Sequence, residues 1–115
     1  MPENREPPGT PTGDGDAAPA DRRLAVERLR REIDALDRKI VVLINERARL
    51  GQAVGREKQA LGWRAAGDPE REREVLLRVT IANEGPIPQD DLLAIYRRLI
   101  AATRALEDQD LDERR

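Results

Sequence analysis

The chain has 115 residues, of which 38% are charged and 38% are hydrophobic, with one Trp, one Tyr and no Phe. This composition favours helices over a sheet, because sheets are enriched in aromatic and β-branched residues. We expect one all-α domain. The 21 basic and 23 acidic residues leave a net charge of -2, which provides no positive field to attract nucleic acid. Cys and His are absent, which excludes thiol nucleophiles and the usual zinc ligands, so no metal or cofactor is expected.

The first 20 residues differ from the rest in composition. They are rich in Pro, Gly and Asp and contain no apolar run. A signal peptide or a membrane anchor requires such a run, so neither is expected. We predict a disordered tail over residues 1–20 and, by default, a cytoplasmic protein with no membrane contact.

Apolar residues three and four positions apart predict a first helix over residues 21–61. No proline interrupts residues 20–68. At about 1.5 Å per residue this helix would be roughly 60 Å long, more than one small domain can cover, so we expect a partner chain. Its apolar stripe consists of Leu29, Ile33, Leu36, Ile40, Leu43, Leu50 and Val54.

Two shorter helices are predicted, one over residues 69–83 and one from about 88 to 107 or slightly beyond. Asp68 suits the N-cap of the first of these, and the glycine and prolines of "NEGPIP" separate the two. The compact domain should cover residues 21–109, followed by a flexible end over 110–115. The inward faces should carry Val75, Val79, Ala82, Leu92, Ile95, Tyr96, Leu99 and Ile100.

Two cations and two glycines interrupt the apolar stripe of the long helix. Arg47 occupies a stripe position, and Lys58 points the same way three turns later. Gly51 and Gly55 lie between them, and each costs about 1 kcal/mol relative to Ala in a helix, so this face should be hollowed to admit another backbone or a ligand. Alternatively, Arg47 reaches solvent along the surface or forms an interhelical ion pair.

Polar residues also flank the inward faces of the two shorter helices. Asp68, Arg71 and Glu72 open the first, and Thr103 and Glu107 continue the apolar face of the second. Each has an ordinary explanation as a cap, a partner of the helix dipole or a solvated helix end. Taken together with the two cations, they suit a pocket for a small dianionic ligand.

Arg30 lies 17 residues before Arg47, about 25 Å along one helix. The two cannot meet one small ligand within a single chain. Arg30 is therefore either a solvated surface residue or a residue that reaches the site of a partner subunit.

The residues "LRREIDALDRKIVVLINERARLGQAVGREK", "DPERERE" and "IYRRLIAATRALE" carry a family resemblance. From Leu24 to Glu107 the chain resembles the all-helical, AroQ-type chorismate mutases. The resemblance implies three helices in an intertwined homodimer with two equivalent sites. It also implies conversion of chorismate to prephenate, in phenylalanine and tyrosine biosynthesis, by a Claisen rearrangement that requires no cofactor.

The resemblance also implies a role for each site residue. Arg30 would come from the other subunit and, with Arg47, Lys58 and Arg71, would hold the two carboxylates of chorismate. Lys58 would also donate to the ether oxygen. Asp68, by its backbone, and Glu72, by its side chain, would bind the ring hydroxyl, and Thr103 would lie near a carboxylate. Arg47, Lys58 and Glu107 would be the catalytic residues.

Glu107 departs from members of the family that place Gln there to donate a hydrogen bond to the ether oxygen. A carboxyl group donates only when protonated. Burial would raise its pKa, while nearby cations would lower it. If Glu107 donates, turnover should fall as pH rises through neutrality, and Glu107→Gln should flatten the profile.

Two other functions fit the same pattern. An isochorismate-pyruvate lyase of the same fold would use similar cations on an isomeric substrate. A non-catalytic helical dimer would use the stripe-breaking charges as ion pairs within an interaction or regulatory module. A complex with another enzyme of the aromatic pathway is also compatible with the sequence.

Overall fold

The computed structural model describes residues 18–63 and 67–113, which form three helices and no strand within those ranges. Helix α1 spans Pro19–Ala60, α2 spans Pro69–Ala82 and α3 spans Gln89–Glu113. The predicted all-α fold with one very long first helix is confirmed. None of these helices is both long enough and apolar enough to cross a membrane.

The ends of α1 and α2 follow from local chain chemistry. Beyond Ala60 the chain turns at Gly62, whose φ of +80° is a conformation that favours glycine, and the Trp63 N–H donates to the Lys58 carbonyl at 2.8 Å. Asp68 caps α2 as predicted, because its Oδ1 accepts a hydrogen bond from the Arg71 N–H at 3.1 Å.

The loop between α2 and α3 is held by the side chain of Asn83. Its amide nitrogen donates to the Ile87 carbonyl at 3.1 Å and to Oε1 of Gln89 at 2.9 Å. Its amide oxygen accepts from the N–H of Gly85 at 2.9 Å. One side chain therefore ties the end of α2 to the start of α3.

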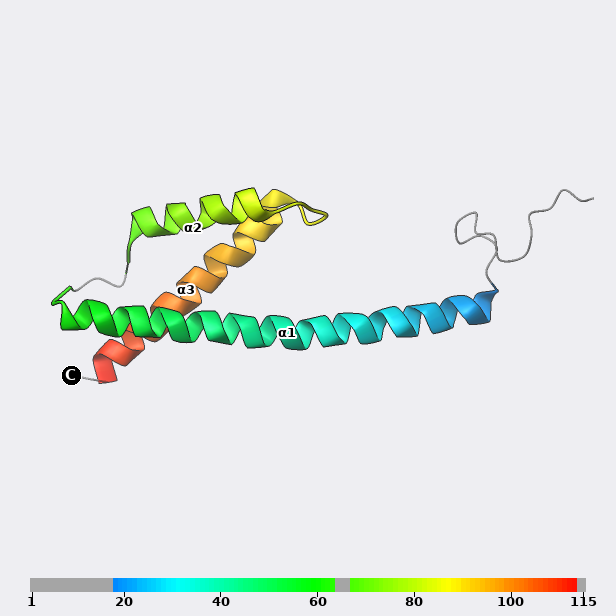
Figure 1. Cartoon of the computed structure of the whole chain (residues 1–115), viewed down its shortest axis with the longest axis horizontal. Helices are drawn as coiled ribbons and strands as arrows, with labels where there is room; N and C mark the ends of the chain where they lie inside the picture. Colours follow the sequence, from blue (N-terminus) through cyan, green and yellow to red (C-terminus); the bar gives the residue numbers. More distant parts are fainter. Residues whose placement is uncertain (1–17, 64–66, 114–115) are drawn as a thin grey trace, which may run out of the picture. The chain divides into compact units, whose positions relative to one another are not determined.

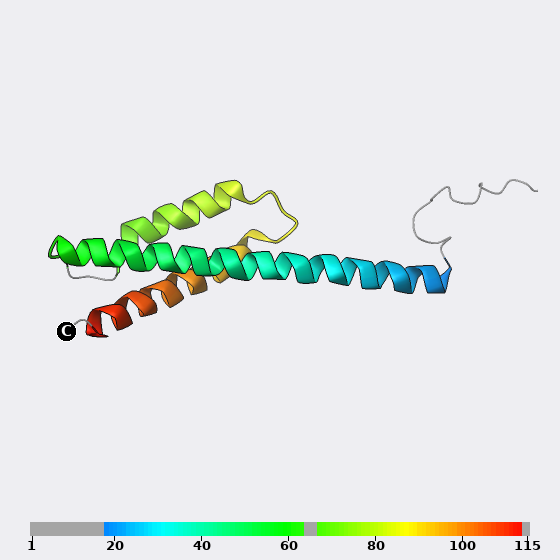
Figure 2. The ribbon, with the colours of Figure 1, turned by 60° about the horizontal axis from the view of Figure 1, so that its bottom comes forward.

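The chain divides into two units, residues 1–40 and 41–115. The described part of the first unit is the N-terminal portion of α1. The second unit contains the C-terminal portion of α1 together with α2 and α3, which the loop at 83–88 joins into a hairpin (Figure 1). In both views the last turns of α3 lie beside the end of α1 (Figure 2).

The C-terminal end of α3 lies further along the chain than predicted. We expected the helix to end at Glu107 or slightly beyond, with a flexible end over 110–115, but it continues to Glu113, and residues 110–113 form its last turn. Asp110 in this turn pairs with Arg56 of α1, with Oδ2 and Nε 3.4 Å apart. The predicted tail lies almost wholly outside the described residues, and its last two positions belong to α1.

Within the described residues of a single chain, no side chain is fully buried. The predicted stripe of α1 is 49% to 69% exposed, from Ile40 to Leu50. On α2 and α3 most of the predicted inward residues are half-buried, but Ala82 and Ile95 are exposed, the latter to 51%. Helical periodicity identifies the apolar face, whereas burial also requires a surface that covers it.

Candidate functional site

One cavity in the 41–115 unit gathers seven of the eight predicted site residues. Its volume is about 320 Å³. The end of α1, the start of α2 and the second half of α3 line it, with apolar walls that include Val54 and Ile100. The eighth predicted residue, Arg30, belongs to the 1–40 unit and does not line this cavity. The seven are Arg47, Lys58, Asp68, Arg71, Glu72, Thr103 and Glu107.

The two glycines of α1 make room for side chains of α3. A Cβ atom on Gly51 would collide with the Thr103 methyl group, and one on Gly55 would lie 3.2 Å from Cγ of Glu107. The hollow face predicted from these glycines therefore exists, and α3 side chains occupy it at these two points. The Thr103 hydroxyl also donates to the Leu99 carbonyl at 3.0 Å, which is the ordinary bond expected of a helical threonine.

Arg47 and Lys58 are both half-buried. The guanidinium carbon of Arg47 lies 5.8 Å from the centre of the Tyr96 ring, within the range of a cation–π contact. Such stacking orients a guanidinium while leaving its N–H groups free to donate to an anion. Tyr96, predicted only as a core residue, thus also positions a site cation.

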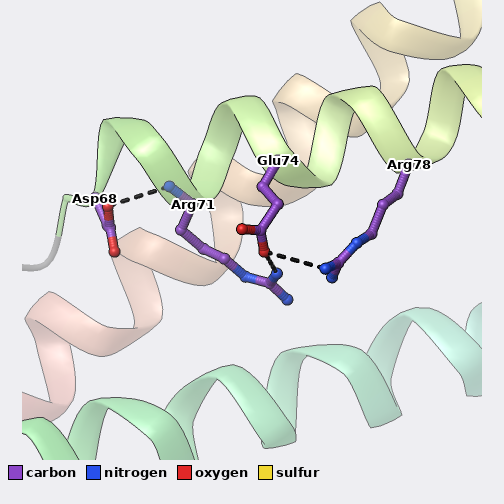
Figure 3. Close-up of polar contacts among 4 residues, drawn as sticks. All are labelled: Asp68, Arg71, Glu74 and Arg78. Atoms are coloured by element: carbon purple, nitrogen blue, oxygen red, sulfur yellow. Dashed lines mark hydrogen bonds and ion pairs between the residues drawn. The ribbon is translucent and has the colours of Figure 1, made fainter.

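Arg71 is more exposed and pairs with a carboxylate of its own helix. Figure 3 shows Arg71 and Arg78 converging on Oε1 of Glu74, with Nη2 of Arg78 at 3.4 Å. Glu74 and Arg78 were not predicted as site residues, although spacings of three and four residues are the usual signal for pairs on one helix. An anionic ligand that binds Arg71 has to compete with Glu74.

Glu72 forms an ion pair with Arg104 of α3, and both side chains are about one-third exposed (34% and 35%). Arg104 also lines the cavity, between Thr103 and Glu107 along α3. Arg104 was not among the predicted site residues. Arg104 lies three residues before Glu107, so the two share one face of the helix. This spacing is the sequence signal from which Arg104 could have been predicted as a site residue.

Glu107 has a pKa above the ordinary range of a glutamate. Burial is the largest cause and raises the pKa, Lys58 lowers it, Asp108 raises it, and Arg104 lowers it. The effect of burial on the pKa of Glu107 therefore exceeds that of the neighbouring cations. A carboxyl group of this kind is protonated over a wider pH range and can then donate a hydrogen bond.

The lining combines four cations with carboxylates, one hydroxyl and apolar walls. Guanidinium and ammonium groups that converge on a small cavity suit an anion with more than one carboxylate. Within residues 18–63 and 67–113 there is no cluster of acidic side chains that could hold a metal ion. The protein is all-helical, and the lining of this cavity is suited to a small polyvalent anion.

The family of the chain follows from sequence comparison. The sequence model described as chorismate mutase type II matches residues 29–108, and the chain belongs to this family. The chorismate mutase of Methanocaldococcus jannaschii is 35% identical over 86 residues, which cover 74% of this chain and 86% of that protein. Form II of the Thermus thermophilus chorismate mutase structure aligns with a TM-score of 0.70 and 36% identity, covering 73% of this chain and 94% of that chain.

Longer relatives also match. The bifunctional chorismate mutase/prephenate dehydratases of Aquifex aeolicus and Pseudomonas aeruginosa are 38% and 40% identical over 86 residues, which cover 71% of this chain. The chain spans about a quarter of the length of these bifunctional relatives, 24% in both cases.

Proposed function

We propose that this protein is a chorismate mutase that converts chorismate to prephenate. The observation that carries the proposal is the meeting of Arg47, Lys58 and Glu107 at one small cavity, where Glu107 has a raised pKa. Membership of the type II chorismate mutase family and the likeness to the Thermus thermophilus structure support it.

The proposed reaction suits the residues present. Chorismate rearranges within one molecule, so no nucleophile, metal or proton relay is required. Catalysis depends on holding the enolpyruvyl arm over the ring and on placing positive charge where negative charge grows on the ether oxygen. Enzymes remove at least about 8 kcal/mol from a barrier, and charge-assisted hydrogen bonds of about 1.5 to 3 kcal/mol each, together with orientation, supply that order of energy.

In the proposed complex, Arg47 and Arg71 bind substrate carboxylates, and Arg71 exchanges Glu74 for one of them. Lys58 donates to the ether oxygen from one side, and protonated Glu107 donates from the other. The backbone of Asp68 and the side chain of Glu72 bind the ring hydroxyl, and Thr103 lies near a carboxylate.

We further propose a homodimer in which the partner subunit supplies Arg30 to the site. The exposed stripe of α1 supports this, because it presents apolar side chains that one chain leaves in contact with water. A second, open cavity of about 650 Å³ supports it as well, since Arg47 and Arg71 line it beside apolar residues of α2 and α3, which a partner helix would cover.

The proposed enzyme acts in the cytoplasm, in phenylalanine and tyrosine synthesis, with residues 21–109 as its catalytic unit. The names of the bifunctional relatives join chorismate mutase to prephenate dehydratase. This pairing supports a complex between the present chain and another enzyme of the aromatic pathway.

The decisive experiment follows the loss of chorismate absorbance with wild-type protein and Arg47→Ala. Prephenate should form with wild type, and Arg47→Ala should lower kcat/KM by about 100-fold or more, the usual effect of removing a charged transition-state contact. The control is Arg73→Ala, which also removes one arginine. Arg73 is exposed on α2, the helix that carries Arg71, and its removal should leave the rate at the wild-type value.

Two outcomes would overturn the proposal. Formation of salicylate and pyruvate from isochorismate, without prephenate from chorismate, would indicate the lyase. Absence of turnover, with no rise in Tm on adding chorismate or a dicarboxylate mimic of the transition state, would indicate a non-catalytic helical dimer.

A further inference from the structure

The ion pair between Glu72 and Arg104 joins the first turn of α2 to α3 at the edge of the cavity. Both side chains line the cavity, and their charged groups are in direct contact. Arg104 also runs along the backbone that precedes the α2 cap, because its Nε and Cζ lie 3.9 Å from the place where a Cβ on Gly67 would be. The guanidinium therefore lies near Gly67 as well as in contact with Glu72.

The charges at the start of α2 are sorted into two separate groups. Arg71 and Arg78 share the Glu74 carboxylate (Figure 3). Arg71, which directly precedes Glu72, is therefore already paired with another carboxylate. Glu72 instead finds its cation on another helix. Without Arg104, the Glu72 side chain would be free to rotate toward solvent.

We propose that Arg104 is a positioning residue, which holds the Glu72 carboxylate at the cavity as an oriented acceptor for the substrate's ring hydroxyl. This inference rests on the proposed function of Glu72. Exposed ion pairs contribute little to the free energy of unfolding. The contribution of Arg104 therefore lies in orientation, where small displacements change rates strongly.

Arg104 has a second effect in the same place, since its positive charge lowers the pKa of Glu107. The groups that face Glu107 are Lys58 from α1 and Arg104 and Asp108 from α3, with Glu72 of α2 reaching Arg104. One guanidinium thus influences two carboxyl groups that line the same cavity.

The test is a kinetic double-mutant cycle with Arg104→Gln, Glu72→Gln and the double variant. Arg104→Gln should lower kcat about tenfold, the factor for one transition-state hydrogen bond, with KM changed less than about threefold. At low pH, where Glu107 is protonated with or without Arg104, Arg104→Gln should have no further effect on kcat in the Glu72→Gln background, because both changes remove the same interaction. Arg104→Lys should recover part of kcat.

Arg56→Gln is the matched control. It removes another half-exposed pair between helices, that of Arg56 and Asp110, which lies outside the cavity lining. Arg56→Gln should leave kcat unchanged. Arg56→Gln and Arg104→Gln should both keep Tm within a few degrees of wild type. If Arg56→Gln lowered kcat as much as Arg104→Gln does, the loss would reflect a general effect of helix packing, and the proposal would be overturned.

A substrate-free measurement separates this inference from the proposed function. The Nη2 resonances of Arg104, the nitrogen that contacts Glu72, should be shifted in wild type and should move to the position of a free guanidinium in Glu72→Gln. Wild-type protein that leaves chorismate unchanged would overturn the proposed function. Normal wild-type turnover combined with unchanged kinetics of Arg104→Gln, or with effects that multiply in the double variant, would overturn the positioning role alone.

Discussion

Glu107 is the residue at which the structure most directly sets a solution property. Its pKa is raised chiefly by burial, and Lys58 opposes this. The protonated form, which can donate to the ether oxygen, is lost as pH rises through that raised pKa. The kcat of the wild type should therefore fall with increasing pH, while Glu107→Gln, which donates at every pH, should give a flat profile in steady-state assays.

Asp108 provides a directional control for this prediction. Its negative charge raises the pKa of Glu107, so Asp108→Asn should move the fall in kcat to lower pH without changing the plateau at low pH. A flat wild-type profile, or a shift to higher pH in Asp108→Asn, would remove Glu107 as the donor.

Individual site residues were predictable where they interrupt an apolar pattern. Arg47 breaks the stripe of α1, and Glu107 continues the inner face of α3, so periodicity alone brought attention to both. Arg104 and Glu74 occupy ordinary polar positions of amphipathic helices. Their partners depend on how the side chains extend across helices, which a sequence pattern does not specify.

At the scale of the helices, the ends were predictable because they depend on a few local residues. The Asp68 cap is the clearest case, since the side chain and the N–H it accepts from are three residues apart. The end of α3 was misplaced because Asp110 is held by Arg56, which is distant in sequence. The side chains that fill the space beside Gly51 and Gly55 could not be predicted for the same reason, since they come from α3, which is also distant in sequence.

The close approach of Gly51 to Thr103 leads to a prediction about the free energy of unfolding. Gly→Ala in an open helix gains about 1 kcal/mol, but overpacking costs about 1 to 3 kcal/mol, so Gly51→Ala should lower the free energy of unfolding by about 1 kcal/mol in urea titrations. Thr103→Ser removes the methyl group that an added Cβ would meet. The double variant should recover the loss, and a failure to recover would place the strain elsewhere.

Gly55→Ala is the informative comparison on the same helix face. Its Cβ would lie 3.2 Å from Cγ of Glu107, a flexible side chain that can move aside. Gly55→Ala should change the free energy of unfolding less than Gly51→Ala does. It should nevertheless lower kcat, and by more than its small effect on stability would suggest, because Glu107 is displaced.

For the whole molecule, the exposed stripe of α1 leads to a test of the shared site. If the partner subunit supplies Arg30, chains carrying Arg30→Ala and chains carrying Arg47→Ala are each inactive alone. Mixed in equal amounts and refolded together, they should regain about a quarter of the wild-type activity, since half of the dimers are mixed and each has one intact site. Equilibrium sedimentation on the same samples measures the dimer.

A mixture that stays inactive while sedimenting as a dimer would show that Arg30 acts in its own chain, and an active Arg30→Ala variant would show that Arg30 is not required. Arg30→Ala mixed with wild type is the dilution control, and its activity should follow the number of intact sites. Sequence reasoning predicted the need for a partner from helix length, but the arrangement of two chains follows from surfaces that only their packing defines.

The absence of any fully buried side chain in residues 18–63, 67–110 and 112–113 of one chain has a consequence for the life of the protein in the cell. In the proposed homodimer, most of the water that must leave apolar surface would leave when two chains meet, so folding and dimerisation would become one event. Newly made chains at low abundance would stay open to proteolysis, and the functional pool would grow more steeply than the rate of synthesis.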